Sequence, residues 1–156
     1  MAIVIEGEER LELPIQRVWE ALNDDSVLRA CIPGCESLEK RSDTEFTATV
    51  VLKVGPIKAK FVGEVTLSNL RPPFGYTIAG EGSGGIAGFA KGGAEVNLTE
   101  EAPNVTLLKY TTNVDIGGKI AQLGGRLISS TAKKLSAQFF STLSDHLSKQ
   151  EASAAV

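Results

Sequence analysis

The spacing of apolar residues changes once along the chain, and this change constrains the fold more than any other feature. From Glu45 to Ile116, apolar residues alternate with polar ones, as in strands that bury one face. From Gly117-Gly118 onward they recur every three or four residues, which is typical of an amphipathic helix. The pattern therefore predicts a run of strands followed by one helix over about residues 118–148, ~45 Å long at 1.5 Å per residue.

The segment before this run predicts one strand and two short helices. Residues 2–13 alternate as a first strand, Pro14 suits the first turn of a helix, and Asp24 or Asp25 suits the N-cap of a second helix that ends near Ala30. Further strands are expected over 45–54, 57–67, 74–78, 86–98 and 108–116, joined by short turns. Short connections and one polar face favour an antiparallel meander. We predict an α+β fold: a curved antiparallel sheet of about seven strands wrapped around the long C-terminal helix.

Size and charge limit the classes of protein that the chain can belong to. Its 156 residues suffice for one domain, expected over 1–148, with a short disordered tail over 149–156. The net charge of −3 gives no indication of a nucleic-acid surface. Neither a signal peptide nor an apolar run long enough to cross a bilayer is found, so we expect a cytoplasmic protein.

The segment Glu81–Ala94 (EGSGGIAGFAKGGA) has almost no side chains. Read with period two, one face carries Ile86, Gly88, Ala90, Gly92 and Ala94. Small residues that face a core leave space, and interiors are normally close-packed. Either another backbone approaches closely there or a ligand fills the space. The rest of the chain favours the ligand.

The ligand-binding residues that we predict share the inward-facing parity of the strands, the inner face of the long helix, or a mouth near the Pro33-Gly34 hinge. They are Leu28, Ile32, Phe61, Tyr76, Ile78, Ile86, Gly88, Ala90, Tyr110, Leu123, Leu127 and Thr131. Tyr76 and Tyr110 are either core tyrosines bonded to a neighbour or polar groups that hold a ligand. Thr131 can act in the same way or bond back to the preceding turn. We expect Trp19 to anchor its helix in the core.

The inward positions carry almost no group suited to catalysis, so we do not expect an enzyme. His146, the single histidine, is expected at a helix end, and the carboxylates Glu64, Glu81 and Glu95 on solvated faces. Cys31 and Cys35 are too few for a disulfide framework or a metal site. The glycine-rich segment also lacks the pattern of a phosphate-binding loop.

Three basic residues recur every seven positions along the predicted helix: Lys119, Arg126 and Lys133. They form a stripe opposite the apolar face, drifting only ~20° per heptad. This stripe is either a solvated surface or a strip that docks on an anionic membrane, at ~1 kcal/mol per basic residue.

Several motifs, in order, resemble the carbon monoxide dehydrogenase CoxG family of START-like (SRPBCC) domains over residues 2–147. They are Val18-Trp19-Glu20-Ala21-Leu22, Ile32-Pro33-Gly34-Cys35, Val54-Gly55-Pro56-Ile57, the Gly82–Gly93 segment, Gly117-Gly118-Lys119, Leu123-Gly124 and Phe139-Phe140. The resemblance implies a helix-grip fold and a non-catalytic accessory protein of a molybdenum-containing CO dehydrogenase or related hydroxylase. It also implies recruitment of that enzyme to the inner face of the cytoplasmic membrane, and a cavity for a quinone or lipid, with no required cofactor.

Two other functions remain open at this point. The domain could be a docking adaptor that recruits the enzyme to the membrane without any ligand. It could also be a cyclase or hydrolase of the kind found elsewhere on this fold, which would need an ionisable group inside the cavity.

Overall fold

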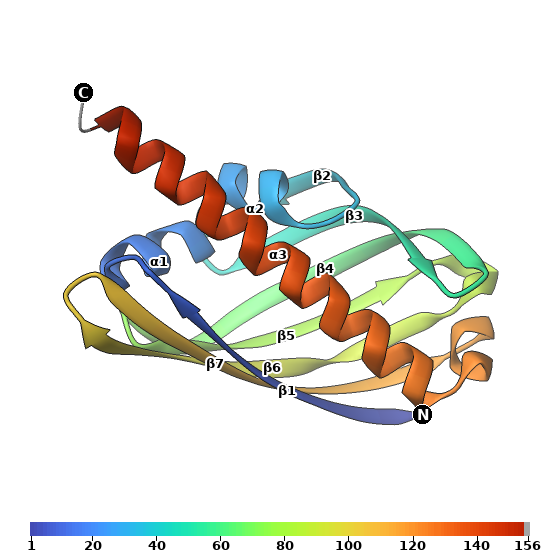
Figure 1. Ribbon diagram of the computed structural model, residues 1–156. Coiled ribbons are helices and arrows are strands. Elements are labelled where there is room, and N and C mark those ends of the chain that lie inside the picture. The colour runs from blue at the N-terminus through green and yellow to red at the C-terminus, as the bar shows by residue number, and fades with distance from the viewer. Residues whose placement is uncertain (155–156) are drawn as a thin grey trace.

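Seven antiparallel strands form one curved sheet, and the long C-terminal helix lies across its concave face (Figure 1). The computed structural model describes the backbone of residues 1–154 and the side chains of residues 1–150. The strand order is β1-β7-β6-β5-β4-β3-β2, so α1 and α2 connect the two edge strands. The elements are β1 (Ala2–Leu11), α1 (Ile15–Leu22), α2 (Asp25–Cys31), β2 (Cys35–Lys40), β3 (Glu45–Val54), β4 (Ile57–Arg71), β5 (Gly75–Ser83), the 3-10 helix η1 (Gly85–Ala87), β6 (Phe89–Ala102), β7 (Val105–Gly117), the 3-10 helix η2 (Lys119–Leu123) and α3 (Gly125–Ala154). The predicted α+β helix-grip architecture is confirmed.

The two short helices begin where the sequence predicts. Pro14 is the N-cap of α1, and its carbonyl accepts the amide of Val18. The Asp24 side chain caps α2 by accepting hydrogen bonds from the backbone amides of Ser26 and Val27. Helix α2 ends at Cys31, one residue beyond the predicted end.

The main core lies between α1, the sheet and the C-terminal half of α3. Leu13, Val18, Leu108, Leu143 and Leu147 are almost completely buried there. The Trp19 ring meets the Tyr76 ring edge-on at 5.5 Å, so its predicted place in the core is confirmed. The hydroxyl of fully buried Thr106 donates to the carbonyl of Leu13 at 2.8 Å, which fixes the β1–α1 connection against β7.

The long helix differs from its prediction at both ends. It begins at Gly125, because Gly118 and Gly124 have φ values of 82° and 91° that interrupt the helix around η2. At the other end it continues to Ala154, so most of the predicted disordered tail is helical, and residues 155–156 lie outside the described part. Lys119 therefore lies on η2, and the basic stripe that we predicted is not one helical face. Arg126 and Lys133 remain together on α3, exposed.

The glycine-rich segment also differs from the predicted continuous strand. Ser83 ends β5 and Phe89 begins β6, so Ile86 lies on η1 in the loop between them and is 83% exposed. Gly88 has a φ of 130°, and a Cβ atom there would collide with the carbonyl oxygen of Gly117. A close backbone approach explains Gly88, and space for a ligand does not.

Candidate functional site

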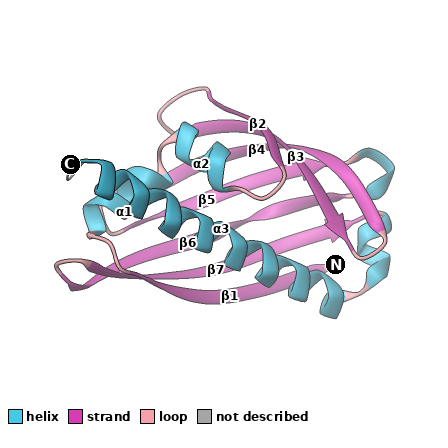
Figure 2. Ribbon diagram, turned by 45° about the horizontal axis from the view of Figure 1, so that its top comes forward, coloured by secondary structure: helices cyan, strands magenta, loops and turns pink. Residues whose placement is uncertain are grey.

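An apolar cavity lies between the sheet and the middle of α3, which crosses the sheet diagonally (Figure 2). It has two chambers, which we name after one residue of each. The Tyr76 chamber, of about 440 Å³, is lined by Leu22, Leu28, Ile32, Pro33, Leu38, Phe46, Ala48, Val65, Leu67, Tyr76, Ile78, Ala94, Val96, Leu108, Tyr110, Thr112, Leu135, Ser136, Phe139 and Phe140. The Phe61 chamber, of about 480 Å³, is lined by Ile32, Pro33, Ala48, Val50, Leu52, Val54, Phe61, Gly63, Val65, Gly82, Ala90, Ile116, Ile120, Ile128, Thr131, Ala132 and Leu135.

Five residues line both chambers, so the two volumes adjoin behind one common wall. These residues are Ile32, Pro33, Ala48, Val65 and Leu135. Each chamber is within the range of ~300–1,000 Å³ that is usual for small-molecule sites. The cavity can therefore hold an elongated apolar molecule that extends from one chamber into the other.

The cavity exists because small residues are aligned across the sheet. Strand pairing places Ala48 opposite Gly63, Gly63 opposite Gly82, and Gly82 opposite Ala90. All four line the Phe61 chamber, so one row across β3, β4, β5 and β6 has almost no side chains. Because α3 touches the sheet mainly near its edges and ends, nothing fills the space above this row.

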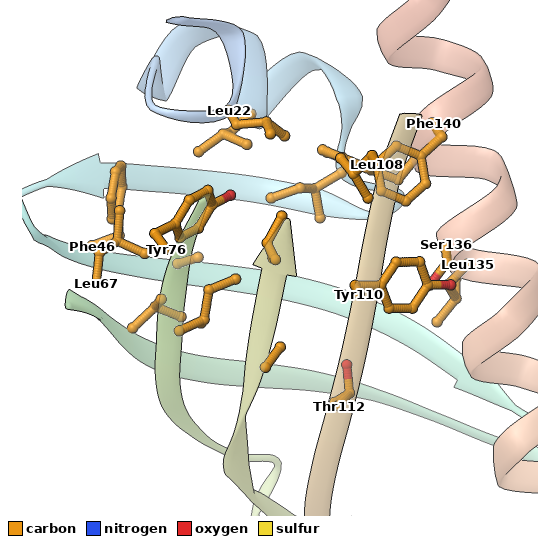
Figure 3. Close-up of a pocket in the computed structure, with 18 of the residues that line it drawn as sticks. Leu22, Phe46, Leu67, Tyr76, Leu108, Tyr110, Thr112, Leu135, Ser136 and Phe140 are labelled. Atoms are coloured by element: carbon orange, nitrogen blue, oxygen red, sulfur yellow. The ribbon is translucent and has the colours of Figure 1, made fainter. Parts of the chain in front are cut away.

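Tyr76 supplies a polar group in the Tyr76 chamber. Its side chain is only 4% exposed, and its hydroxyl points into the chamber (Figure 3). No hydrogen bond joins this hydroxyl to any described residue, although buried tyrosines normally have a partner. Desolvation by burial raises the pKa of Tyr76, so the phenol stays protonated and can donate.

Three other hydroxyls line the same chamber: those of Tyr110, Thr112 and Ser136. The Tyr110 ring lies over Gly7 of β1 and stacks on Phe140, with ring centroids 6.0 Å apart. None of the three forms a hydrogen bond with another described side chain or with the described backbone. In the Phe61 chamber, by contrast, the Thr131 hydroxyl donates to the Leu127 carbonyl at 2.8 Å, so Thr131 bonds back to its own helix.

Eight of the twelve predicted ligand-binding residues line the cavity, and four do not. Leu28, Tyr76, Ile78 and Tyr110 line the Tyr76 chamber, Phe61, Ala90 and Thr131 line the Phe61 chamber, and Ile32 lines both. Ile86 and Gly88 are excluded for the reasons given above. Leu123 and Leu127 pack instead against the β3–β4 hairpin, where a Cβ atom on Gly55 would lie 2.9 Å from Leu127 Cδ2.

The prediction missed several lining residues that the same patterns already contained. Ala48 and Ala94 share the inward parity of their strands, and Leu135 and Phe139 share the inner face of α3. Their positions were identifiable from the sequence, but the part of each element that faces the cavity depends on strand register and helix placement.

The cavity has no group suited to acid–base or nucleophilic catalysis among its described lining residues. Neither lining set contains a carboxylate, an amine, a guanidinium, an imidazole or a thiol. Glu64, Glu81 and Glu95 are exposed on the outer face of the sheet, as predicted. His146 contacts Gln150 at 3.2 Å on the exposed side of α3.

The two cysteines do not form a redox or metal site with other described residues. Cys31 is buried and Cys35 half-buried, both are free, and desolvation raises the pKa of both thiols. In the described part of the chain, no three His, Cys, Asp or Glu side chains gather as metal ligands would.

The family model for CoxG, a protein of the carbon monoxide dehydrogenase system, matches residues 7–148. The chain belongs to the CoxG family. A conserved protein from Geobacillus kaustophilus, known from a crystal structure, is 30% identical, with 94% of this chain and 96% of that chain covered and a TM-score of 0.89. Membership of the CoxG family links the chain to carbon monoxide dehydrogenase. No curated protein matches the chain closely enough to count as a relative.

More distant structures share the fold alone. A START superfamily protein from Mycobacterium smegmatis is 10% identical, with 94% and 98% of the two chains covered and a TM-score of 0.73. The Zhui aromatase/cyclase from Streptomyces sp. R1128 is 12% identical, with 96% of each chain covered and a TM-score of 0.71. The fold of this CoxG family member is thus shared by an enzyme, so fold alone does not decide between binding and catalysis. Within residues 1–154, no helix combines the length and the apolarity needed to cross a bilayer.

Proposed function

We propose that the protein is a non-catalytic accessory protein of a carbon monoxide dehydrogenase-type molybdenum hydroxylase that carries a hydrophobic ligand, a quinone or lipid, in its cavity. In this role it connects the enzyme with the membrane in which such ligands dissolve. The observation that carries the proposal is the cavity itself: two adjoining chambers with apolar walls and a few hydroxyls that have no protein partner.

The distribution of the hydroxyls supports one orientation of the ligand. A polar head with a carbonyl oxygen would lie in the Tyr76 chamber, where the protonated Tyr76 phenol can donate a hydrogen bond. The Phe61 chamber offers no free hydroxyl, because that of Thr131 is already bonded to its helix. An isoprenoid or acyl tail would fill this second chamber.

The absence of ionisable groups from the described walls favours binding over catalysis. A cyclase or hydrolase needs a positioned acid, base or nucleophile. The two tyrosines are the strongest acids among the described lining residues, and burial makes the Tyr76 phenol a weaker acid still. This composition suits a carrier, which must release its ligand unchanged.

A pair of alanine variants tests the carrier proposal. Ala90→Leu places a larger side chain in the Phe61 chamber, whereas Ala79→Leu places the same side chain on the exposed outer face of β5. After purification in parallel, organic extracts of both proteins are analysed by mass spectrometry for quinones and lipids. We expect the ligand to be retained by Ala79→Leu and depleted at least severalfold in Ala90→Leu. Equal ligand content in the two variants, or none in the wild type, would contradict the proposal.

A further inference from the structure

Three loops that are far apart in the sequence meet at the end of the molecule that also holds the N-terminus (Figures 1 and 2). They are the β3–β4 hairpin, the β5–β6 loop with η1, and the η2 segment that leads into α3. The hairpin reaches α3 through Gly55 and Leu127, and Gly118 beside η2 contacts Gly88 beside η1. We call this region the lysine-rich end.

The lysine-rich end exposes apolar side chains to solvent. Ile86, at the tip of the β5–β6 loop, is 83% exposed, which is far more than a folded protein needs for packing. Phe89 and Val62 lie behind it on the outer face of the sheet, where strand pairing places both beside Ser83. Both are about half exposed.

Basic side chains surround these apolar residues. Lys53 and Lys58 are direct neighbours across the β3–β4 hairpin, Lys119 lies on η2, and Arg126 lies on the first turn of α3. All four are exposed, and none forms an ion pair with a described residue. A nearby acid, Asp115, is held by the N-terminal ammonium at 3.0 Å. The opposite end of the molecule is acidic instead, with Glu12, Glu20, Asp24, Asp25, Glu100 and Glu101 exposed.

We propose that the lysine-rich end docks on an anionic lipid bilayer, with Ile86 inserted among the headgroups. This inference rests on the membrane contact in the proposed function and assigns it to a surface other than the α3 stripe. Basic side chains attract an anionic leaflet, and an exposed loop tip can enter the interface. A stable protein interface buries ~1,200 Å² or more in total, for which three scattered apolar side chains are a poor core.

The position of the Phe61 chamber agrees with this orientation. The Phe61 ring lies between that chamber and the β5–β6 loop, because a Cβ atom on Gly84 would lie 2.7 Å from the ring. A ligand that enters head-first from a bilayer on this side would bring its head to the Tyr76 chamber and leave its tail next to the membrane.

Paired charge reversals test which surface docks. Lys53→Glu/Lys58→Glu changes the lysine-rich end alone, and Lys133→Glu/Lys134→Glu changes exposed lysines of α3 alone. Binding is measured by flotation with vesicles of phosphatidylcholine containing 30% phosphatidylglycerol, and with pure phosphatidylcholine. Each lost charge should weaken partitioning about fivefold, so the first variant should bind about 25-fold more weakly than the wild type, or weaker still. The second should bind like the wild type, and wild-type binding should fall as salt is added.

Ile86 tests the insertion separately from the charges. Ile86→Ser should weaken binding to the anionic vesicles about tenfold without changing the thermal midpoint, because the side chain packs against little. Ile86→Trp should keep binding and show a blue-shifted emission on the vesicles. Unchanged binding in Ile86→Ser, or an unshifted emission in Ile86→Trp, would overturn the insertion.

Three results would overturn the docking surface as a whole: no wild-type binding to anionic vesicles, loss of binding in the α3 variant, or unchanged binding in the hairpin variant. A hairpin variant that still binds vesicles but no longer binds the hydroxylase would show a protein-docking surface instead. Extracted ligand is measured in every variant, because the carrier function and the docking surface can fail separately. Ligand retained with no vesicle binding rejects only the docking surface, and vesicle binding as predicted with an empty cavity rejects only the carrier function.

Discussion

Replacing Tyr76 with phenylalanine should weaken ligand binding without weakening the fold. The ring would keep its edge-on contact with Trp19, and the hydroxyl that is lost has no described protein partner. Folding therefore loses no hydrogen bond, and the free energy of unfolding of the ligand-free protein should stay within ~0.5 kcal/mol of the wild type or rise. A hydrogen bond to the ligand contributes about 0.5–1.5 kcal/mol, so its Kd should rise about two- to twelvefold.

Thr106→Val is the matched control for this change. The Thr106 hydroxyl is fully buried and bonded to the Leu13 carbonyl, outside the cavity. Its loss leaves a buried acceptor without a partner, which should cost about 1–3 kcal/mol of stability and leave the Kd unchanged.

Two measurements decide the outcome. Urea denaturation gives the stability of both variants, and quenching of Trp19, the single tryptophan, gives the Kd for a short-chain quinone. A Tyr76→Phe variant that binds the quinone as tightly as the wild type would refute the role of the hydroxyl. A loss of more than ~1 kcal/mol of stability in that variant would refute the absence of a protein partner.

Two further predictions concern the fold. Gly88→Ala should destabilise the protein by about 1–3 kcal/mol in urea denaturation, because residue 88 has a positive φ and its Cβ atom would meet the Gly117 carbonyl; a stability equal to that of the wild type would show that the loop can move aside. Alkaline pH should also destabilise the fold. Burial raises the pKa of Tyr76 above the unfolded value of about 10, so its contribution is complete below pH ~10 and is lost as the pH rises through the folded pKa, at up to ~1.4 kcal/mol per pH unit. Equilibrium unfolding at pH 9 to 11 should show a steeper loss for the wild type than for Tyr76→Phe, and parallel losses would contradict this.

The sequence was sufficient for the architecture because its periodicity is strong. Alternation in β3 and β4 and the 3.6-residue period of α3 each point to one buried face, and the Asp24 cap and Pro14 mark helix starts. The weak signal is β2, with sequence CESLEK, which was not located. It is a short, charged edge strand with one partner, β3, so it needs no alternating apolar face.

The cavity was predictable in part. The sequence shows small residues along β6, but the cavity depends on a row across four strands, and that row exists only once strand register is known. For the same reason Gly88 was misassigned, since the close approach of Gly117 is a contact between segments 29 residues apart. Ile86 was placed inside by parity because the change from strand to η1 has no signal beyond glycine itself.

The most direct test of the carrier account is native mass spectrometry of the wild-type protein purified without detergent. The account predicts a mass above that of the chain, and the excess should disappear on denaturation and match a quinone or lipid in the extract. It also predicts that an added quinone occupies any protein that is found empty. A protein that shows only the mass of the bare chain, before and after incubation with excess quinone or lipid, would contradict the account.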